Sequence, residues 1–379
     1  MNVVSIGTER KLFEDSPTRD RVLSMGKSFS EYHIVVFSTK ENKFKKQIIG
    51  NTHIYPTNSS HKLFYIFDAI KIVFSILKNF EEKQKKETVL TVQDPFECGL
   101  VGLVVSKIKN IPLHVQVHTD LFSPFFKNTF LQYIRMIIAP FVLRRAGSIR
   151  CDSQRMKDGI LKKRLSNAPI DVLPIFIDVK KYEKDPDSNV HDLFPEKRIV
   201  ILMASRLEPE KEIPMALDVF ARICLKYPGR FGLAVVGDGS LSSSLKNRVK
   251  RLKIEHSVVF VPWTNNLVSF YKTADLFWIN SRFEGYGLTI AEALICGTPV
   301  LASDVGAVPE IVLEGKNGLV CPPKNELCFY GKISSIAEDE GRLIYMKDYL
   351  KNNPYIHKYA DQVDYERLFV ENISKSINR

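Results

Sequence analysis

The sequence predicts an α/β protein built from two Rossmann-like domains, whose parallel sheets face each other across a cleft. Three observations support this prediction. The chain has 379 residues, which is long for one typical domain and comfortable for two. Short apolar runs typical of buried strands alternate with longer runs of helical spacing in both halves. A polar stretch with two prolines, residues 179–196, is typical of a linker between the halves.

The first half begins with a strand and a loop, from Gly7 to Asp20. Apolar residues recur at helical spacing over 61–84, and Pro95 starts a further helix. Residues 125–147 are aromatic and basic, and Pro140 inside them indicates a helix pair that covers the sheet. Six strands are expected here: Asn2–Ile6, Ile34–Phe37, Thr52–Tyr55, Thr88–Val92, Leu113–Val117 and Ser148–Cys151.

The second half repeats the pattern. A helix is expected over Leu288–Cys296, where Gly297 and Pro299 fit a helix stop. Residues 325–350 and about 354–376 are also expected to be helical. The strands expected here are Arg198–Leu202, Phe231–Val236, Val258–Val261, Leu276–Ile279, Val300–Ala302 and Gly318–Cys321. Successive parallel strands joined by helices are right-handed crossovers, so a second parallel sheet follows.

The stretch 275–312 carries the clearest chemistry. Its loop, 281–287, follows a strand, and ligands of parallel sheets bind outside the carboxyl ends of the strands. Gly285, Gly287 and the start of the next helix predict an anion site, most often for phosphate. The acids Glu284 and Glu292 beside it favour a ligand rich in hydroxyls. Each acid taken singly is also explained as a solvated surface residue.

A second loop predicts a place for a diphosphate. Arg206 and Lys211 lie five residues apart, after the strand that opens the second half. Two cations at such a strand end can neutralise a diphosphate, although a solvated pair is the alternative. Further on, Gly237-Asp238-Gly239 lacks the third glycine of the dinucleotide motif. It fits a loop that lets the backbone approach a nucleotide.

His118 stands directly after the strand Leu113–Val117. A ligand would lie at this strand end, although an isolated histidine is more often structural. No Ser/His/Asp or Cys/His arrangement and no ordered metal-ligand cluster is visible in the sequence. Asp185-Pro186-Asp187 has the spelling of a metal motif but lies in the expected linker.

The net charge of +11 is concentrated in the first half. Residues 1–180 hold 28 Lys and Arg against 17 Asp and Glu, whereas the remainder is neutral. A basic half suggests an anionic partner, namely a membrane surface, a phosphorylated acceptor or nucleic acid, although solubility alone is an alternative. Residues 125–147 are the candidate surface for anionic lipid. No nucleic-acid recognition module is visible, so that partner is not expected.

The composition indicates the compartment. The six cysteines form no C-x-x-C pair and mostly lie in apolar runs, so buried free thiols and a reducing environment are expected. Met1 leads directly into a strand-like run without a signal peptide, and no apolar run approaches the length of a membrane span. We therefore expect a cytoplasmic protein, with peripheral contact at the inner face of the membrane as a further hypothesis.

The second half resembles the donor-site region of retaining GT-B glycosyltransferases of the family 4 type, the glycosyl transferases group 1. The resemblance rests on Asp275, Ser281, the Glu284 and Glu292 pair, the string GTPVLASDVGAVPEIV with Asn317-Gly318, and the R-L-x-x-x-K pattern of Arg206 and Lys211. It is strong over 198–322 and thin over 1–180. The sequence departs from the family pattern at Gly7, which stands alone where the family has a Gly-Gly pair, at VLPIFID, which lacks the usual Asn-Gly, and at Ser205 and Glu212, where glycine is frequent.

The resemblance implies two GT-B domains. The first, 1–180, meets the acceptor and is joined by a final helix, 355–379. The second, 181–354, binds the nucleotide-sugar. His118, Arg206, Lys211 and Glu284 are implied as catalytic residues. The donor is implied to contact Gly237, Gly285, Tyr286, Gly287, Leu288, Thr289 and Glu292. No metal and no cofactor is implied.

The function that follows is retaining transfer of a hexosyl unit from a UDP- or GDP-sugar. The acceptor is a glycan or a lipid-linked molecule in the biosynthesis of cell-surface polysaccharide. Two alternatives from other classes stay open. A sugar-nucleotide epimerase or hydrolase of this fold would turn over the donor without an acceptor, and a two-domain sugar-binding protein would perform no chemistry.

Overall fold

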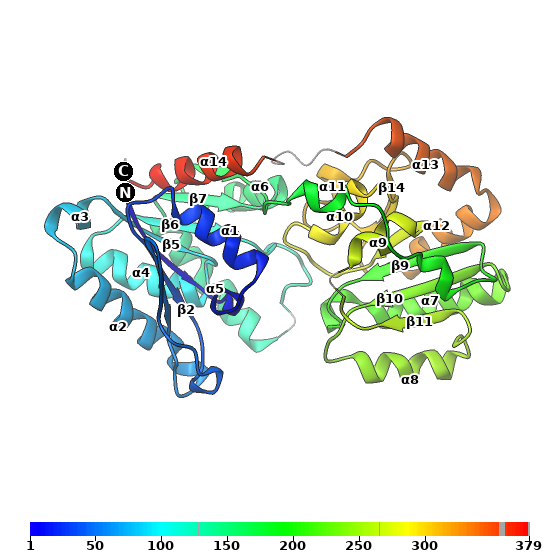
Figure 1. The fold of residues 1–379 in the computed structure, drawn as a ribbon, viewed down its shortest axis with the longest axis horizontal. Helices are drawn as coiled ribbons and strands as arrows, with labels where there is room; N and C mark the ends of the chain where they lie inside the picture. The colour runs from blue at the N-terminus through cyan, green and yellow to red at the C-terminus, as the bar shows by residue number, and fades with distance from the viewer. Residues whose placement is uncertain (128, 265, 356–360, 378–379) are drawn as a thin grey trace. The chain divides into compact units, whose positions relative to one another are not determined.

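The computed structural model describes residues 1–127, 129–264, 266–355 and 361–377. The chain forms two compact units, each with its own sheet (Figure 1). Unit 1 consists of Met1–Pro174 together with Gln362–Arg379, and unit 2 consists of Ile175–Asp361. The first unit ends six residues before the expected boundary at 180.

Unit 1 begins with a strand and closes with the last helix of the chain. Its strands are β1 (Asn2–Gly7), β2 (Tyr32–Val36), β3 (Gln47–Ile49), β4 (Thr52–Pro56), β5 (Thr88–Val92), β6 (Leu113–Val117), β7 (Ser148–Cys151) and β8 (Ile170–Val172). Its helices are η1 (Arg10–Phe13), α1 (Pro17–Gly26), η2 (Lys40–Asn42), η3 (Lys62–Phe64), α2 (Tyr65–Lys78), α3 (Glu82–Lys86), α4 (Glu97–Lys109), α5 (Phe130–Arg145), α6 (Gln154–Lys162) and α14 (Gln362–Ser374).

The strand order in unit 1 is β3-β4-β2-β1-β5-β6-β7-β8, and every neighbouring pair except β3 with β4 is parallel. The order reverses between β1 and β5, so the loops after these two strands flank the switch point of the sheet. Helices α2, α4 and α5 pack side by side as one layer, while α14 packs on β5 and β7 (Figure 1). His118 follows β6 at the ligand-binding edge.

Unit 2 is a second α/β unit. Its strands are β9 (Ile199–Ala204), β10 (Phe231–Val236), β11 (Val258–Val261), β12 (Leu276–Ile279), β13 (Val300–Ser303) and β14 (Gly318–Cys321). Its helices are η4 (Val179–Tyr182), η5 (Val190–Leu193), η6 (Pro209–Lys211), α7 (Ile213–Lys226), α8 (Ser242–Leu252), α9 (Leu267–Thr273), α10 (Leu288–Ile295), α11 (Val308–Ile311), α12 (Glu326–Glu338) and α13 (Gly341–Asn352).

The sheet of unit 2 is parallel throughout, in the order β11-β10-β9-β12-β13-β14. Successive residues of each strand face opposite sides, so the sheet has a core on each face. Along β9, Ile199, Ile201 and Met203 pack with α7, α8 and α12, whereas Val200, Leu202 and Ala204 pack with α9 and α10. The two-sided burial explains why the strands are continuous apolar runs in the sequence. The α/β class with parallel sheets is confirmed.

Residues 179–196 are not a free linker. Val190 and Phe194 are buried in the core of unit 2, and the Phe194 ring covers Gly232 so closely that a Cβ there would meet it at 2.6 Å. The backbone N–H of Val190 donates to the Thr273 hydroxyl at 3.0 Å. The expectation was wrong because two apolar anchors sit within a stretch whose average composition is polar.

Three helix expectations and one loop expectation need correction. Residues 125–147 hold one helix, α5, because Ala139, Val142 and Leu143 are buried around Pro140 and packing outweighs the lost backbone hydrogen bond. The expected loop 7–20 contains η1 and the start of α1. The run 61–84 is divided among η3, α2 and α3, and 325–350 is divided into α12 and α13. Part of the helix expected over 354–376, residues 356–360, lies outside the described residues.

The cysteines differ from the expectation of free thiols. Cys321 at the end of β14 and Cys328 in α12 form a disulfide, although they are seven residues apart and match no C-x-x-C pattern. Their pairing follows from the turn that brings the start of α12 back over β14. The other four cysteines are free, and Cys98 and Cys151 are buried.

Candidate active site

The candidate site of unit 2 lies where its strand order reverses, between β9 and β12. Two loops meet there, residues 205–212 after β9 and 280–287 after β12. The Asn280 side-chain amide donates to the carbonyl of Glu212 at 2.7 Å, and the Arg282 N–H donates to the carbonyl of Glu210 at 2.8 Å. These bonds join two loops that are about 70 residues apart in the sequence.

The central contact joins Lys211 and Glu284. The Lys211 ammonium donates to Glu284 Oε1 at 2.5 Å, and the Ser281 hydroxyl donates to the same oxygen at 2.6 Å. The side chains of Lys211 and Glu284 are only 13% and 14% exposed. The ion pair is therefore largely shielded from solvent. The structure therefore brings together two of the four residues predicted to be catalytic.

Arg206 is placed differently. Its side chain is 71% exposed and pairs with Glu210 at 2.8 Å within the same loop. An exposed guanidinium on a loop can move to meet an anion, whereas Lys211 is already fixed.

Glycines shape the backbone around these loops. Gly287 has φ +92° and caps the amino end of α10, a conformation that side chains with a Cβ rarely adopt. Gly237 has φ +138°, and its Cα faces the Ser205 carbonyl too closely for any side chain. The carbonyl oxygen of Gly285 approaches Gly306, where a Cβ would meet it at 2.7 Å. A side chain at Gly237 or Gly306 would therefore force these loops apart.

A cavity of about 760 Å³ lies beside α10 in unit 2. Three of the residues predicted to bind the donor line it: Leu288, Thr289 and Glu292. The remaining lining residues are Lys181, Tyr182, Lys184, Asp185, Asp187, Trp263, Thr264, Asn266, Leu267, Val268 and Ser269.

The Glu292 side chain lines this cavity and is partly buried. Burial raises the pKa of its carboxyl, and hydrogen bonds from Tyr182 and Tyr271 oppose the shift. The Tyr271 hydroxyl donates to Glu292 Oε2 at 3.1 Å. A buried carboxylate held by two phenols still has acceptor capacity for the hydroxyls of a ligand.

Several residues that line this cavity were not predicted from the sequence to bind a ligand. Tyr182 and Asp187 fell within the supposed linker, and Trp263 follows β11, whose carboxyl end was not considered as a ligand-binding edge. The Asp187 carboxylate accepts the Ser269 hydroxyl at 3.0 Å, which fixes the segment to α9. The position of Trp263 after a strand of the parallel set was the available signal.

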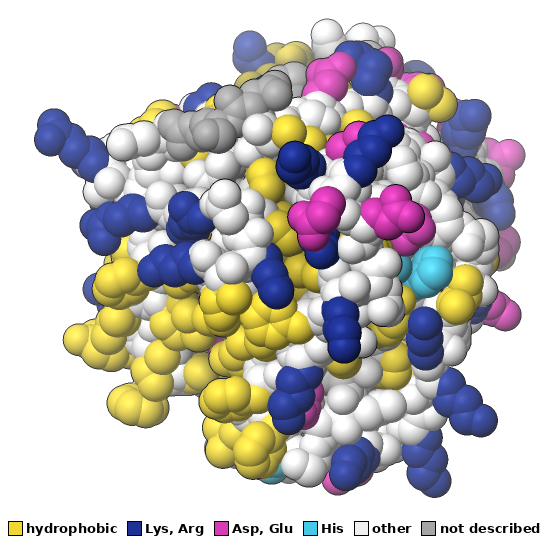
Figure 2. Space-filling model, turned by 90° about the vertical axis from the view of Figure 1, so that its left-hand side faces the viewer, with side chains coloured by type: hydrophobic (Ala, Val, Ile, Leu, Met, Phe, Trp, Pro, Cys, Tyr) yellow, Lys and Arg dark blue, Asp and Glu magenta, His cyan; other side chains and the backbone are white. Residues whose placement is uncertain are grey.

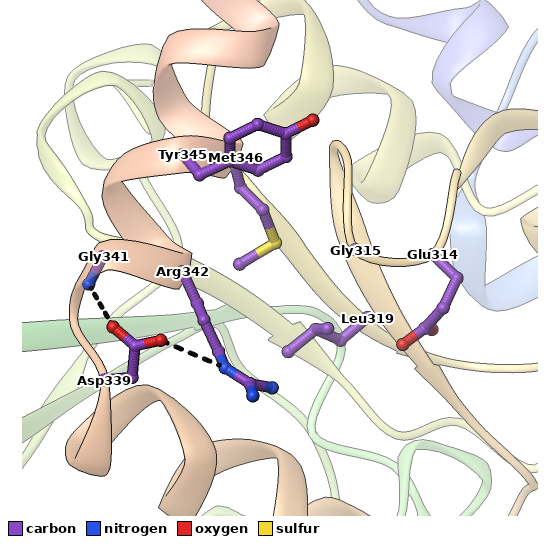
Figure 3. A pocket seen from close by; sticks show the side chains of 8 residues that line it. All are labelled: Glu314, Gly315, Leu319, Asp339, Gly341, Arg342, Tyr345 and Met346. Atoms are coloured by element: carbon purple, nitrogen blue, oxygen red, sulfur yellow. Dashed lines mark hydrogen bonds and ion pairs between the residues drawn. The ribbon is translucent and has the colours of Figure 1, made fainter.

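Tyr286 lies elsewhere. Its side chain is buried in the core of unit 2, and its hydroxyl lies 3.2 Å from that of Tyr355. Any ligand contact of Tyr286 would therefore use its backbone. A second cavity of about 380 Å³, lined by Glu314 and β14 on one side and by α13 on the other, contains none of the predicted site residues (Figure 3).

His118 belongs to unit 1. Its Nδ1 lies 3.0 and 2.9 Å from the two carboxylate oxygens of Asp152, and its Nε2 lies 3.2 Å from Gln116 Oε1. The side chain of His118 is 29% exposed, whereas that of Asp152 is 1% exposed. Asp152 was not predicted from the sequence. It lies near His118 only because β7 pairs with β6 in the folded sheet. Among the described residues, no group of three or more His, Cys, Asp or Glu is arranged to hold a metal ion.

Part of unit 2 is similar in sequence to a known protein family. Residues 185–353 match the family model described as glycosyl transferases group 1. The matched residues lie within unit 2. The match covers the loops of Lys211 and Glu284. It also covers the residues that line the Glu292 cavity, except Lys181, Tyr182 and Lys184.

Relatives in this group have several names. The chain is 29% identical over 239 residues to alpha-monoglucosyldiacylglycerol synthase of Streptococcus pneumoniae, covering 58% of this chain and 52% of that protein. It is 28% identical over 157 residues to N-acetyl-alpha-D-glucosaminyl L-malate synthase of Bacillus anthracis, covering 41% of each. The matched region spans about half the length of the curated relatives, 52%, 43% and 49% for three of them.

Solved structures extend the likeness to the whole chain. HepE of Anabaena, solved with UDP, superposes with a TM-score of 0.73 at 18% identity, over 99% of this chain and 100% of that one. Sucrose-phosphate synthase of Thermosynechococcus elongatus superposes with a TM-score of 0.77 at 16% identity, over 99% and 100%. Glycosyltransferases of this kind have the GT-B fold, and the expected fold is confirmed.

Proposed function

We propose that this protein is a retaining glycosyltransferase that moves a hexosyl unit from a UDP- or GDP-sugar to a glycan or lipid-linked acceptor in the biosynthesis of cell-surface polysaccharide. The observation that carries the proposal is the Lys211–Glu284 pair at the switch point of unit 2, in the unit whose cavity holds Glu292. Binding of a nucleotide-sugar needs three groups: a cation for the diphosphate, a carboxylate for the sugar hydroxyls, and a cavity with a carboxylate for the nucleotide. Lys211, Glu284 and the cavity of Glu292 supply them in this proposal.

Known relatives support the choice of substrates. HepE has been solved with UDP-glucose, which favours a nucleotide-sugar donor. The pneumococcal relative is named for a glucosylated diacylglycerol, and a further structural neighbour, WaaB, is described as a lipopolysaccharide outer core galactosyltransferase. These names favour an acceptor attached to lipid or to the cell surface.

The geometry suggests a role for each residue. Lys211 and Arg206, with the N–H groups at the start of α10, stabilise the negative charge that develops on the leaving diphosphate. Glu284 accepts hydrogen bonds from hydroxyls of the transferred sugar, and Glu292 accepts them from the ribose. His118 contacts the sugar from the acceptor side. These roles need no metal ion, so metal-independent transfer is part of the proposal.

Thermal unfolding with added nucleotides tests the donor site. UDP, GDP, ADP and dTDP are each added to wild type, to Glu292→Ala and to Glu255→Ala, an exposed glutamate of unit 2 that serves as control. A nucleotide present at about 100 times its dissociation constant adds about 2.7 kcal/mol of stability. We expect one diphosphate to raise the midpoint of wild type and of the control but not of Glu292→Ala. Equal shifts of the unfolding midpoint in all three proteins would show that Glu292 does not bind the nucleotide.

An acceptor-free assay separates transfer from the alternatives. A hydrolase or epimerase converts the sugar-nucleotide donor without an acceptor, and a sugar-binding protein leaves it intact. A transferase releases the nucleotide rapidly only when acceptor is present. Donor conversion that is independent of acceptor would contradict the proposed transfer.

Contact with an anionic membrane is the second part of the proposal, and it concerns unit 1. On α5, the side chains of Phe130, Tyr133, Ile137 and Phe141 follow one face of the helix, and each is more than half exposed. The layer of α2, α4 and α5 holds seven Lys and Arg against two Asp and Glu. Figure 2 shows hydrophobic side chains gathered on one face of this unit, with Lys and Arg among and around them. Apolar area combined with positive charge matches an anionic lipid surface.

Vesicle co-sedimentation tests this contact. The protein is sedimented with vesicles of phosphatidylcholine alone and of phosphatidylcholine with phosphatidylglycerol. We expect recovery with the anionic vesicles and its loss in Phe130→Ser/Ile137→Ser. Leu225→Ser, which changes an equally exposed residue of unit 2, is the matched control and should bind as wild type does. Equal recovery with both vesicle types would contradict the contact. The described residues contain no helix long and apolar enough to span a bilayer.

A further inference from the structure

A chain of hydrogen bonds, buried in its middle part, leads from Asp171 to His118 in unit 1. At its first end, Asn372 Nδ2 donates to Asp171 Oδ2 at 2.6 Å. Burial raises the pKa of Asp171, but hydrogen bonds from Lys375 and Asn372 outweigh it, so the pKa is lowered and the carboxylate is ionised. An ionised carboxylate only accepts, so the amide of Asn372 has a single orientation and its Oδ1 points to His114.

His114 continues the chain with the same donor-to-acceptor direction of its hydrogen bonds. Its Nε2 lies 2.6 Å from Asn372 Oδ1 and therefore carries a proton. Burial lowers the pKa of His114 to about 3, so the ring is neutral at pH 7 and its Nδ1 has none. Nδ1 accepts the Thr91 hydroxyl proton across 2.7 Å. Thr91 Oγ1 is then the acceptor for Gln116 Nε2 at 3.2 Å.

Gln116 is oriented by a second, independent contact. Arg150 NH1 donates to Gln116 Oε1 at 2.9 Å, and a guanidinium only donates. The chain from Asp171 and the contact from Arg150 thus give the same orientation of the Gln116 amide. Its oxygen lies 3.2 Å from His118 Nε2, so this nitrogen faces an acceptor and needs a proton of its own.

The other nitrogen of His118 also faces acceptors. Both oxygens of Asp152 lie within 3.0 Å of Nδ1. A neutral imidazole has one N–H, so it would leave one ring nitrogen with its lone pair against an oxygen. We propose that unit 1 holds His118 as an imidazolium with a proton on both ring nitrogens. Asp152 and Gln116 are the positioning residues.

The surrounding charges agree with this assignment. Asp152 is buried, and a buried carboxylate needs a cation that hydrogen-bonds to it. Arg150 NH2 lies 3.7 Å away, but Arg150 directs its donors to Gln116, to the carbonyls of Leu173 and Pro174 and to the Tyr365 hydroxyl. His118 supplies the direct hydrogen bond. On the same strand His114 is neutral, and Asp120 after β6 is a further acid of this region.

This inference deepens the proposed function and rests on it for the role of His118. An imidazolium cannot abstract a proton. It presents positive charge and an N–H donor to the reacting groups, so we expect His118 to stabilise developing negative charge or hold a sugar oxygen. The fixed orientation of the ring reduces the reorganisation that this requires.

Nitrogen NMR of protein labelled with ¹⁵N-histidine measures the protonation directly. The chain has eight histidines, and the signals of His118 are identified by their loss in His118→Gln. Near pH 7, we expect both ring nitrogens of His118 to have shifts of protonated nitrogen. Asp152→Asn should convert the ring to a neutral tautomer. Glu31→Gln removes the carboxylate that hydrogen-bonds His33 at 2.7 Å and is the control that should leave His118 unchanged. An unprotonated nitrogen of His118 in wild type would overturn the inference, whether or not the variants fold.

Turnover separates this inference from the proposed function. We expect Asp152→Asn to lower kcat by about 10²-fold with little change in the KM for the donor. Full kcat in a variant whose His118 is neutral would overturn the role of the charge. If the NMR result is as expected but wild type turns over no sugar donor, the proposed function fails and the protonation stands. If turnover is found with a neutral His118 in wild type, the inference fails and the function stands.

Discussion

The Lys211 ammonium lies 2.5 Å from a carboxylate oxygen of Glu284, which comes 73 residues later in the chain. The two residues lie in the loops that follow β9 and β12, the neighbouring strands at which the order of the sheet reverses. The contact therefore forms only when the sheet is assembled. It places one positive and one negative group at the edge where parallel sheets bind their ligands.

Lys211→Ala and Glu284→Ala should remain folded and lose transfer. Each removes one oriented charge from the proposed donor site, and such a loss typically costs about 10²–10³-fold in kcat. The check is nucleotide release from the sugar donor with acceptor present, together with circular dichroism to confirm folding. Full turnover by both variants would show that the pair has no part in the reaction.

The same pair makes a prediction about stability. Lys211→Met leaves the largely buried Glu284 without its cation, and an uncompensated buried charge costs about 3–5 kcal/mol. The double variant Lys211→Met/Glu284→Gln removes both charges, so it should unfold at higher urea concentration than Lys211→Met alone. A double variant less stable than Lys211→Met would contradict the charge argument.

Glu292 predicts a dependence of stability on pH. Burial raises the pKa of its carboxyl in the folded protein, so the stability it contributes is present below its unfolded pKa and is lost as the pH rises through the folded pKa. Glu292→Gln should therefore raise the unfolding midpoint near pH 7, by roughly 2–4 °C for about 1 kcal/mol. The difference from wild type should vanish near pH 4. A constant difference across this range would exclude the titration of Glu292 as its cause.

Trp263 provides an optical signal for the cavity. The chain has two tryptophans; Trp263 lines the cavity and is 53% exposed, whereas Trp278 is fully buried in β12. Binding of the cognate nucleotide should change the emission of Trp263 and leave Trp278 unaffected. The response should therefore disappear in Trp263→Phe. A response that persists in this variant would place the nucleotide away from Trp263.

Phe194 tests whether residues 179–196 belong to the core of unit 2. Its ring is buried against Gly232, so Phe194→Ala should destabilise unit 2 by about 3–5 kcal/mol. Leu193→Ala is the matched control, because the neighbouring Leu193 is exposed and should cost little. Urea unfolding followed by Trp278 fluorescence reports on this unit. Equal midpoints for the two variants would mean that the segment does not pack as described.

Local pattern in the sequence was sufficient for much of the secondary structure. Strands β5, β6, β7, β10, β11, β12 and β14 have the predicted bounds. Most residues of these strands are buried, and their apolar residues stand close together, so the pattern is visible within a few residues. The loop chemistry around Lys211, Glu284 and Glu292 was predictable for the same reason, since the residues follow recognisable strands or begin a helix.

The local sequence pattern did not predict burial or pairing where these depend on contacts with other segments of the chain. Residues 179–196 are polar on average, and only the packing of Val190 and Phe194 against unit 2 shows that they belong to a core. The pairing of Cys321 with Cys328 depends on how the chain turns between β14 and α12. Composition does not carry this information.

The sequence by itself thus determined the α/β class, most strands and the positions of Lys211 and Glu284 in loops that follow strands. Only the tertiary structure decided which of these residues meet. Asp152 reaches His118 because β7 lies beside β6, and Tyr182 and Tyr271 reach Glu292 because η4 and α9 both pack on α10. The physical reason is that a strand is specified by its own residues, whereas the order of strands in a sheet is specified by contacts among segments far apart in the chain.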